Sequence, residues 1–181
     1  EAAAERVQTV YTIVSVRNET LVDEIFRRID QLNRDEVLTT EEKVDIYRRE
    51  LPQKLDQHVN AFIQANAGTD AYSPELLEEV RRSVLEQKYA IPEETYFKLP
   101  RLSAVQIAEM RMVARDVVRQ IMSSPLTDAE SARTQVAELV NASPLALTIE
   151  REVVQELARY AITPNRFPDE AATEAARKEA M

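Results

Sequence analysis

Three arginines recur at intervals of four residues and could together hold an anionic group. Arg111, Arg115 and Arg119 would lie on one side of a helix, where planar guanidinium groups can bind a carboxylate or a phosphate. Acidic residues such as Glu109 and Asp116 are close in the sequence, which favours a solvated face with ion pairs inside the protein. Arg111 and Arg115 are nevertheless kept as candidate ligand-binding residues.

A second candidate site is the segment around Pro92 and Pro100, which is rich in apolar and aromatic residues. An irregular segment of this kind can line a groove for a peptide or a small ligand, although it more often packs on the core as a cap. The candidate ligand-binding residues here are Tyr89, Tyr96, Phe97, Lys98 and Arg101.

Few other side chains could support catalysis or bind a metal. The chain has no cysteine and a single glycine, which excludes thiolate sites, disulfides and glycine-rich phosphate loops. Its single histidine, His58, has no obvious partner, and such a residue is typical of the boundary of a core. Glutamate pairs lie where helix polarity and solubility explain them. We therefore expect no catalytic residue, no metal site and no cofactor.

The charge balance argues against a nucleic-acid partner. Lysine and arginine total 23 against 32 for aspartate and glutamate, a formal net charge of −9. Nucleic-acid binding depends largely on neutralising phosphates and needs the opposite balance. With 44% hydrophobic and 30% charged residues, the composition is that of a folded domain. No apolar run approaches the roughly 20 residues needed to cross a bilayer.

Helical periodicity is the dominant pattern and predicts an all-α, multi-helix bundle of about seven to nine helices. Each predicted helix has apolar residues three or four positions apart. These stripes are Leu21, Ile25, Ile29 and Leu32; Leu55, Val59, Phe62 and Ile63; Leu77, Val80 and Val84; Ile107, Met110, Ala114, Val117, Val118 and Ile121; Ala132, Val136, Leu139 and Val140; and Ile149, Val153, Leu157 and Tyr160.

Capping residues predict where several of these helices begin. Capping boxes are predicted for Thr39 with Glu42, Ser103 with Gln106, and Thr127 with Glu130. Simple N-caps are predicted at Asn18 and at Ser73, which precedes Pro74. A proline and the single glycine should also shape the chain. Pro52 is expected to interrupt or kink a helix, and Gly68 to end one.

Extended structure is expected in one place only. Residues 11–16, reading YTIVSV, are β-branched enough for a short extended segment. Near the other end of the chain, Pro164 and Pro168 are expected to flank a turn before a final helix rich in alanine and glutamate.

Motifs near both ends of the chain carry a family resemblance. The opening EAAAERVQTVY and the closing AITPNRFPDEAATEAARKEAM resemble the extracytoplasmic domain of PgpH-like seven-transmembrane receptors with an intracellular HD hydrolase domain. The family usually has two prolines before its valine and tyrosine, and this chain lacks both. The matching residues are Val10, Tyr11, Pro164, Asn165, Asp169 and Thr173. Their expected tasks are architectural: Pro164 stops a helix, Asn165 bonds turn backbone, and Asp169 caps the final helix.

The resemblance implies a domain cut from a larger membrane protein. Residues 1–181 would form a single helical sensor-type domain on the extracytoplasmic side of the bacterial plasma membrane, and Glu1, Ala2 and Ala3 would match Glu179, Ala180 and Met181 in helical style. Elsewhere in that protein, further spans would lead to a cytoplasmic metal-dependent phosphodiesterase that hydrolyses cyclic di-AMP. The hydrolase's histidine-aspartate motif is absent here, because Gln57 and Val59 flank the only histidine.

We therefore expect a non-catalytic signal-input domain whose ligand shifts a two-state equilibrium of helix packing. Its partners would be an unidentified extracytoplasmic ligand or protein and the adjoining transmembrane helices. The alternative is a protein-binding or dimerisation scaffold without a small-molecule site, for which a homodimer is one form. A weaker alternative is a free-standing helical chaperone or adaptor. An independent enzyme is the least favoured interpretation.

Overall fold

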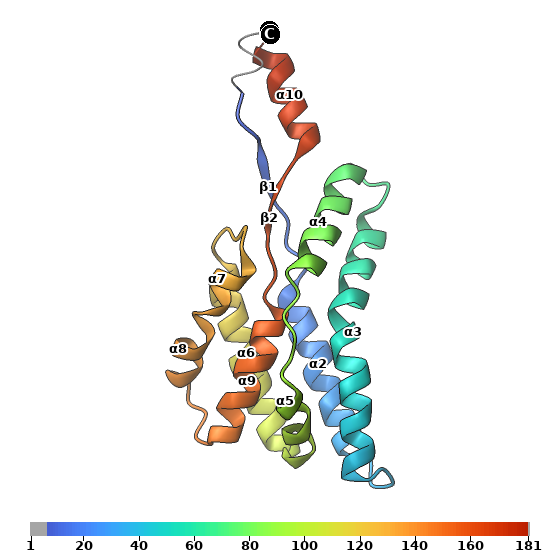
Figure 1. Ribbon diagram of the computed structural model, residues 1–181, viewed down its shortest axis with the longest axis vertical. Helices are drawn as coiled ribbons and strands as arrows, with labels where there is room; N and C mark the ends of the chain where they lie inside the picture. The colour runs from blue at the N-terminus through green and yellow to red at the C-terminus, as the bar shows by residue number, and fades with distance from the viewer. Residues whose placement is uncertain (1–6, 181) are drawn as a thin grey trace.

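The computed structural model describes residues 7–180, and it confirms the predicted all-α, multi-helix bundle (Figure 1). The only sheet among these residues is a two-stranded ribbon. In chain order the elements are β1 (Tyr11–Ile13), α2 (Asn18–Asn33), α3 (Thr40–Asn66), α4 (Pro74–Glu86), α5 (Glu93–Lys98), the 3-10 helix η1 (Leu99–Arg101), α6 (Ala104–Met122), α7 (Ala129–Arg133), α8 (Val136–Asn141), α9 (Thr148–Ala161), β2 (Arg166–Pro168) and α10 (Glu170–Ala180).

The core lies where α2, α6 and α9 pack together, with α3 against α2 and α8 against α6 and α9. With one exception, the residues of the apolar stripes predicted from the sequence lie in this core or pack against it. The exception is Leu77, which is buried outside the main cluster, where Leu76 takes the predicted place. Burial of these side chains supplies most of the favourable free energy of folding, because short helices are marginal in water on their own. Tyr47 and Tyr160 are among its largest members and are fully buried.

Local capping signals predicted some helix starts correctly and two incorrectly. The boxes at Thr39 and Ser103 are present, and Ser73 caps α4. The Thr127 box is wrong: the side chain of Asp128 accepts the hydrogen bond from the Glu130 N–H instead, and the helix expected to follow is divided into α7 and α8.

Asn18 does not cap α2 either. It is buried, and its side-chain amide donates to the Ala161 carbonyl (2.7 Å) and to the Thr163 hydroxyl (2.9 Å). The residue before it, Arg17, occupies the N-cap position in the left-handed region (φ 61°) and forms no side-chain capping bond. A long-range polar contact has therefore replaced the predicted local one.

Of the two outcomes expected at Pro52, an interruption or a kink, the interruption is absent, because α3 continues through this residue. Pro52 has no N–H to donate, and its ring crowds the preceding turn. Two side chains from other elements bond to the backbone here: the Leu55 N–H donates to the hydroxyl of Tyr160 (2.8 Å), and the ammonium of Lys88 donates to the Pro52 carbonyl. We infer that these tertiary contacts help the helix to tolerate the proline.

A narrow ribbon joins the bundle to α10. Of the extended segment predicted over residues 11–16, residues 11–13 form the strand β1. Residues 166–168, expected as part of a turn, form β2 and pair with β1 in antiparallel register. Figure 1 shows both strands leaving the bundle together, with α10 beyond them. We call residues 10–14 and 165–173 the neck. The helical structure expected for Glu1–Ala3 and Met181 concerns residues outside the described part of the chain.

Candidate functional site

The aromatic candidates from the sequence divide between a cavity and the surface. Tyr89 and Tyr96 line a cavity of about 290 Å³ together with Tyr160. Phe97 is 54% exposed, with the guanidinium of Arg48 stacked 5.5 Å from its ring centre. The segment between the two prolines thus packs partly on the core and partly faces solvent.

The cationic candidates are mostly engaged in ion pairs. Lys98 pairs with Glu152 (2.6 Å). On α6, Arg111 contacts Asp23 of α2 at 2.9 Å, and Arg115 contacts the same carboxylate at 3.4 Å. These contacts join two helices across the bundle surface, and the remaining candidate, Arg101, is exposed. The structure does not bring the two groups of candidates into one site.

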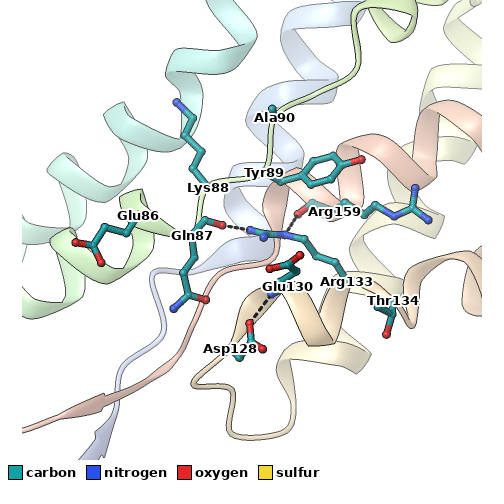
Figure 2. A pocket seen from close by; sticks show the side chains of 10 residues that line it. All are labelled: Glu86, Gln87, Lys88, Tyr89, Ala90, Asp128, Glu130, Arg133, Thr134 and Arg159. Atoms are coloured by element: carbon teal, nitrogen blue, oxygen red, sulfur yellow. Dashed lines mark hydrogen bonds between the residues drawn. The ribbon is translucent and has the colours of Figure 1, made fainter.

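A cavity of about 550 Å³ lies where the α4–α5 connection, α7 and the end of α9 meet (Figure 2). Tyr89 belongs to its wall, but the other wall residues were not predicted as a site. They include Gln87, Asp128, Glu130, Arg133 and Arg159. We call this space the Arg133 cavity.

Arg133 is the one wall residue that combines a full charge with burial, since it is 8% exposed. Its Nε donates to the Arg159 carbonyl (2.9 Å), and its Nη2 donates to the carbonyls of Gln87 (2.6 Å) and Ile162 (2.9 Å). Its guanidinium also stacks over Tyr89, 5.6 Å from the ring centre. Figure 2 shows it between Gln87 and Arg159. These contacts fix the plane of the guanidinium.

No carboxylate in the described part of the chain forms an ion pair with Arg133, so its charge is compensated only at longer range. Burial lowers the pKa of Arg133, and the nearby charges of Glu130 and Asp128 oppose that shift. Burying a charge without a partner is costly. A site of this kind is well suited to an anionic group that arrives from outside.

The sequence did contain a signal for Arg133. Ala129, Ala132, Arg133, Val136 and Val140 follow helical spacing, and all five are buried. An arginine on an apolar stripe is unusual, because arginine is rarely buried without a partner. The carbonyls that hold it come from distant parts of the chain, and no local pattern could predict them.

The neck contains the motif residues of the chain ends. Asn165 is buried, and its side chain accepts from the Leu126 N–H (2.6 Å) and donates to the carbonyls of Ser124 (3.0 Å) and Met122 (3.3 Å). Its backbone carbonyl accepts from the Val14 N–H (2.8 Å). The expected bonding of turn backbone is thus a tie between the neck and the α6–α7 connection.

Asp169 and Thr173 hold β1 against the start of α10. Asp169 accepts from the Thr12 hydroxyl (2.7 Å), and its other carboxylate oxygen caps α10 through the Ala172 N–H (3.1 Å). Thr173 accepts from the Val10 N–H (2.9 Å). The predicted cap at Asp169 is therefore present. Tyr11 lies on the surface of the neck, and the guanidinium of Arg166 stacks over it, 3.9 Å from the centre of the Tyr11 ring. Pro164 directly precedes Asn165 in the chain.

We expect Asp169→Ala to release the neck locally without unfolding the bundle. The change removes a helix cap and a cross-strand hydrogen bond, together about 1 to 2 kcal/mol. Hydrogen exchange of the α10 amides should become about tenfold faster, while that of the α6 and α9 amides stays unchanged. Asp116→Ala, at an exposed position on α6, is the control and should leave α10 unaffected. Equal exchange rates in the two variants would contradict this expectation.

His58 forms structural contacts at the base of the neck. Its Nε2 lies within hydrogen-bond distance of the carbonyls of Val16 and Arg17, and its Nδ1 lies 3.7 Å from Glu24. Arg17 is the left-handed residue at the start of α2. We infer that the imidazole helps to hold this strained junction.

Comparison with known proteins identifies the family. No helix between residues 7 and 180 is long and apolar enough to cross a membrane. No curated protein and no solved structure matches the chain. One family described as 7TM-HD extracellular matches residues 1–181, and its description implies an extracytoplasmic position within a membrane protein. The predicted resemblance to this family is thereby confirmed, and the chain belongs to the family of extracellular domains of 7TM-HD proteins.

Proposed function

We propose that this domain receives an extracytoplasmic signal and passes it to an HD phosphodiesterase that hydrolyses cyclic di-AMP inside a bacterial cell. Family membership supports a sensor-type role outside the membrane. The domain is not the catalytic HD domain of the family, and in our proposal its contribution is conformational. A ligand that prefers one arrangement of the bundle would shift its population and thereby alter the membrane-spanning part.

One observation carries this proposal: the two ends of the described chain leave the bundle through a single hydrogen-bonded neck (Figure 1). Residues more than 150 positions apart are joined there, since Thr12 bonds Asp169 and Val10 bonds Thr173. A change at the root of the neck would therefore act on both ends together. Such a paired connection can move as a unit and bias two adjoining segments.

A cross-link within the neck tests this proposal in the full-length protein in lipid vesicles. Ile13 and Arg166 are directly paired across the strands, so Ile13→Cys with Arg166→Cys places two thiols at a distance that a disulfide can bridge. This domain has no other cysteine. We expect oxidation to change the rate of cyclic di-AMP hydrolysis at least about twofold and reduction to restore it. The single-cysteine variants are controls, and an unchanged rate after complete cross-linking would overturn the proposal.

A dimerisation scaffold is the second candidate, and an exposed stripe on α6 favours it. Val105 is 78% exposed and Met112 is 62% exposed; they lie on the same face of α6, about two helical turns apart, with the exposed Ala108 between them. In this alternative two copies would pack along α6. Sedimentation of the domain with and without Met112→Glu would distinguish the two functions, because only a scaffold requires a dimer that this substitution dissociates.

A further inference from the structure

We propose that the Arg133 cavity binds the carboxylate of a small zwitterion, either a free amino acid or a short peptide with free ends. This inference rests on the proposed function in one respect: it names the chemical class of the signal that the domain would receive.

The guanidinium of Arg133 has a face left for a ligand. Its Nε and Nη2 are used by three backbone carbonyls, whereas Nη1 has no hydrogen-bond partner among residues 7–180. The residue lines the cavity and is 8% exposed. Neutral carbonyls satisfy donors but do not neutralise charge. A carboxylate bonded to Nη1 would do both, and charge-assisted hydrogen bonds of this type are strong.

The other charges of the cavity favour a ligand with a cationic group as well. Glu86, Asp128 and Glu130 all lie in the wall. The ammonium of Lys88 does not offset them, because it bonds the Pro52 carbonyl and Asp56, and Figure 2 shows its side chain directed away from Arg133. A polyanion would be repelled by these carboxylates. A zwitterion can place its carboxylate on Arg133 and its ammonium beside Glu130 or Asp128.

The size and lining of the cavity fit this class. Its volume of about 550 Å³ lies within the usual range for small-molecule sites and leaves room for an amino acid or a few peptide units. Tyr89 supplies an aromatic wall, and its hydroxyl is held by Glu156. Arg159, the remaining cation of the wall, is paired with Glu156 at 2.8 Å. Within the described part of the chain, Arg133 is therefore the cation of the wall that has no carboxylate partner.

The position of Arg133 also connects this cavity to the neck. Its Nη2 bonds the carbonyl of Ile162, which lies three residues before the tie at Asn165. The Gln87 side chain, on the opposite wall, bonds both the Ala129 N–H (2.8 Å) and the Thr127 carbonyl (3.1 Å). A ligand that reorients the guanidinium would therefore act, through the Ile162 carbonyl, on the segment that leads into β2.

Binding to the 181-residue chain can be measured with defined pools. The probes are the twenty free L-amino acids and a pool of tripeptides with free ends, which distinguish the two sources of zwitterion. Matched tripeptide pools with an amidated carboxyl end or an acetylated amino end test each charge separately. We expect a free-ended pool at saturating concentration to raise the thermal unfolding midpoint by about 5 °C and the amidated pool to leave it unchanged. Failure of every pool, or equal binding of the amidated pool, would overturn the inference.

Substitutions then locate the site. Glu130→Gln removes one charge at an exposed position and should weaken binding about tenfold, as should acetylation of the ligand. Arg133→Lys should abolish binding, after circular dichroism has established that the variant folds. Arg34→Met, which removes an exposed cation at the end of α2, is the control and should bind normally. Unchanged affinity in both Glu130→Gln and Asp128→Asn would refute the zwitterion assignment even if Arg133→Lys does not fold.

The binding test is independent of the neck experiment. Hydrolysis that responds to the neck cross-link, combined with no binding of any pool, would remove the ligand class and leave the input function supported. Binding of the free-ended pools combined with a cross-link that does not change hydrolysis would support the ligand class and remove the input function.

Discussion

Asn165→Ala is expected to lower the free energy of unfolding by about 3 kcal/mol, an effect far larger than most surface substitutions produce. The Asn165 side chain is buried and bonds three backbone groups of the α6–α7 connection. Alanine would leave the Leu126 N–H and the carbonyls of Met122 and Ser124 without these partners. Urea unfolding at neutral pH measures the change, which corresponds to about 10 °C in the thermal midpoint.

Two comparisons make this prediction specific. Asn141→Ala alters an exposed residue at the end of α8 and should cost less than about 0.5 kcal/mol. Asn165→Asp keeps an oxygen acceptor for the Leu126 N–H but loses the amide donor and directs a negative charge at two carbonyls. It should therefore be at least as destabilising as alanine at pH 7. A loss no greater for Asn165→Ala than for Asn141→Ala would show that the tie does not stabilise the bundle.

The contacts of Asn165 illustrate what sequence reasoning could and could not reach. Its role in bonding backbone follows from the chemistry of asparagine beside a proline, and that role is present. The groups it bonds lie about 40 positions earlier in the chain, between α6 and α7. The pairing of β1 with β2 is similarly distant. Three-residue strands have too little alternation to predict a partner, so β2 was expected as part of a turn.

The capping signals in the sequence predicted helix starts correctly where no tertiary contact within the described residues competes for the capping side chains. Ser103 with Gln106 and Thr39 with Glu42 form capping boxes at exposed helix starts, where nothing else competes for the side chains. The prediction of an N-cap at Asn18 failed because this residue is buried beside the end of α9, where its side chain donates to Ala161 and Thr163 instead of capping its own helix. Tertiary contacts therefore overrode local propensity at the position where the neck enters the bundle.

The candidate site was likewise predicted from the sequence only in part. Sequence reasoning placed Tyr89 in a ligand-binding segment, and it lies in the wall of the Arg133 cavity. Arg111 and Arg115 share a helical face, as their spacing predicts, but the acidic residues that engage them come from α2. Periodicity determines which side of a helix a residue occupies; only the packing of helices determines what faces it.

Two buried tyrosines should make the bundle unfold steeply at alkaline pH. Tyr47 and Tyr160 are both fully buried, and burial raises the pKa of each above its usual value of about 10. Around Tyr47, the charges of Asp30 and Glu50 add to this shift, whereas Arg28 opposes it. The Tyr47 hydroxyl donates to the Ile29 carbonyl (3.0 Å) or to Asn33, so its ionisation would also remove a buried donor.

The sign of the effect follows from linkage. Because the folded-state pKa of each tyrosine is raised, the stability that these groups contribute is fully present below about pH 10. Above that pH the unfolded chain loses protons that the folded chain retains. The free energy of unfolding should then fall by up to about 1.4 kcal/mol per pH unit for each tyrosine, or about 2.7 kcal/mol for both. A domain of ordinary stability would lose much of its margin within two pH units.

Urea unfolding between pH 9 and 11.5 tests this, with the slope of free energy against pH as the readout. Tyr160→Phe should lower stability at pH 7, because the Leu55 N–H loses its acceptor, but it should halve the contribution of the pair to the alkaline slope. The exposed Tyr11 provides the control: Tyr11→Phe should leave that slope as in the wild type, since this residue is 42% exposed rather than buried. The slope separates proton linkage from a lost hydrogen bond, which shifts stability equally at every pH. Equal alkaline slopes of the free energy of unfolding in the wild type and in Tyr160→Phe would contradict this prediction, because the Tyr160 phenol would then ionise without destabilising the bundle.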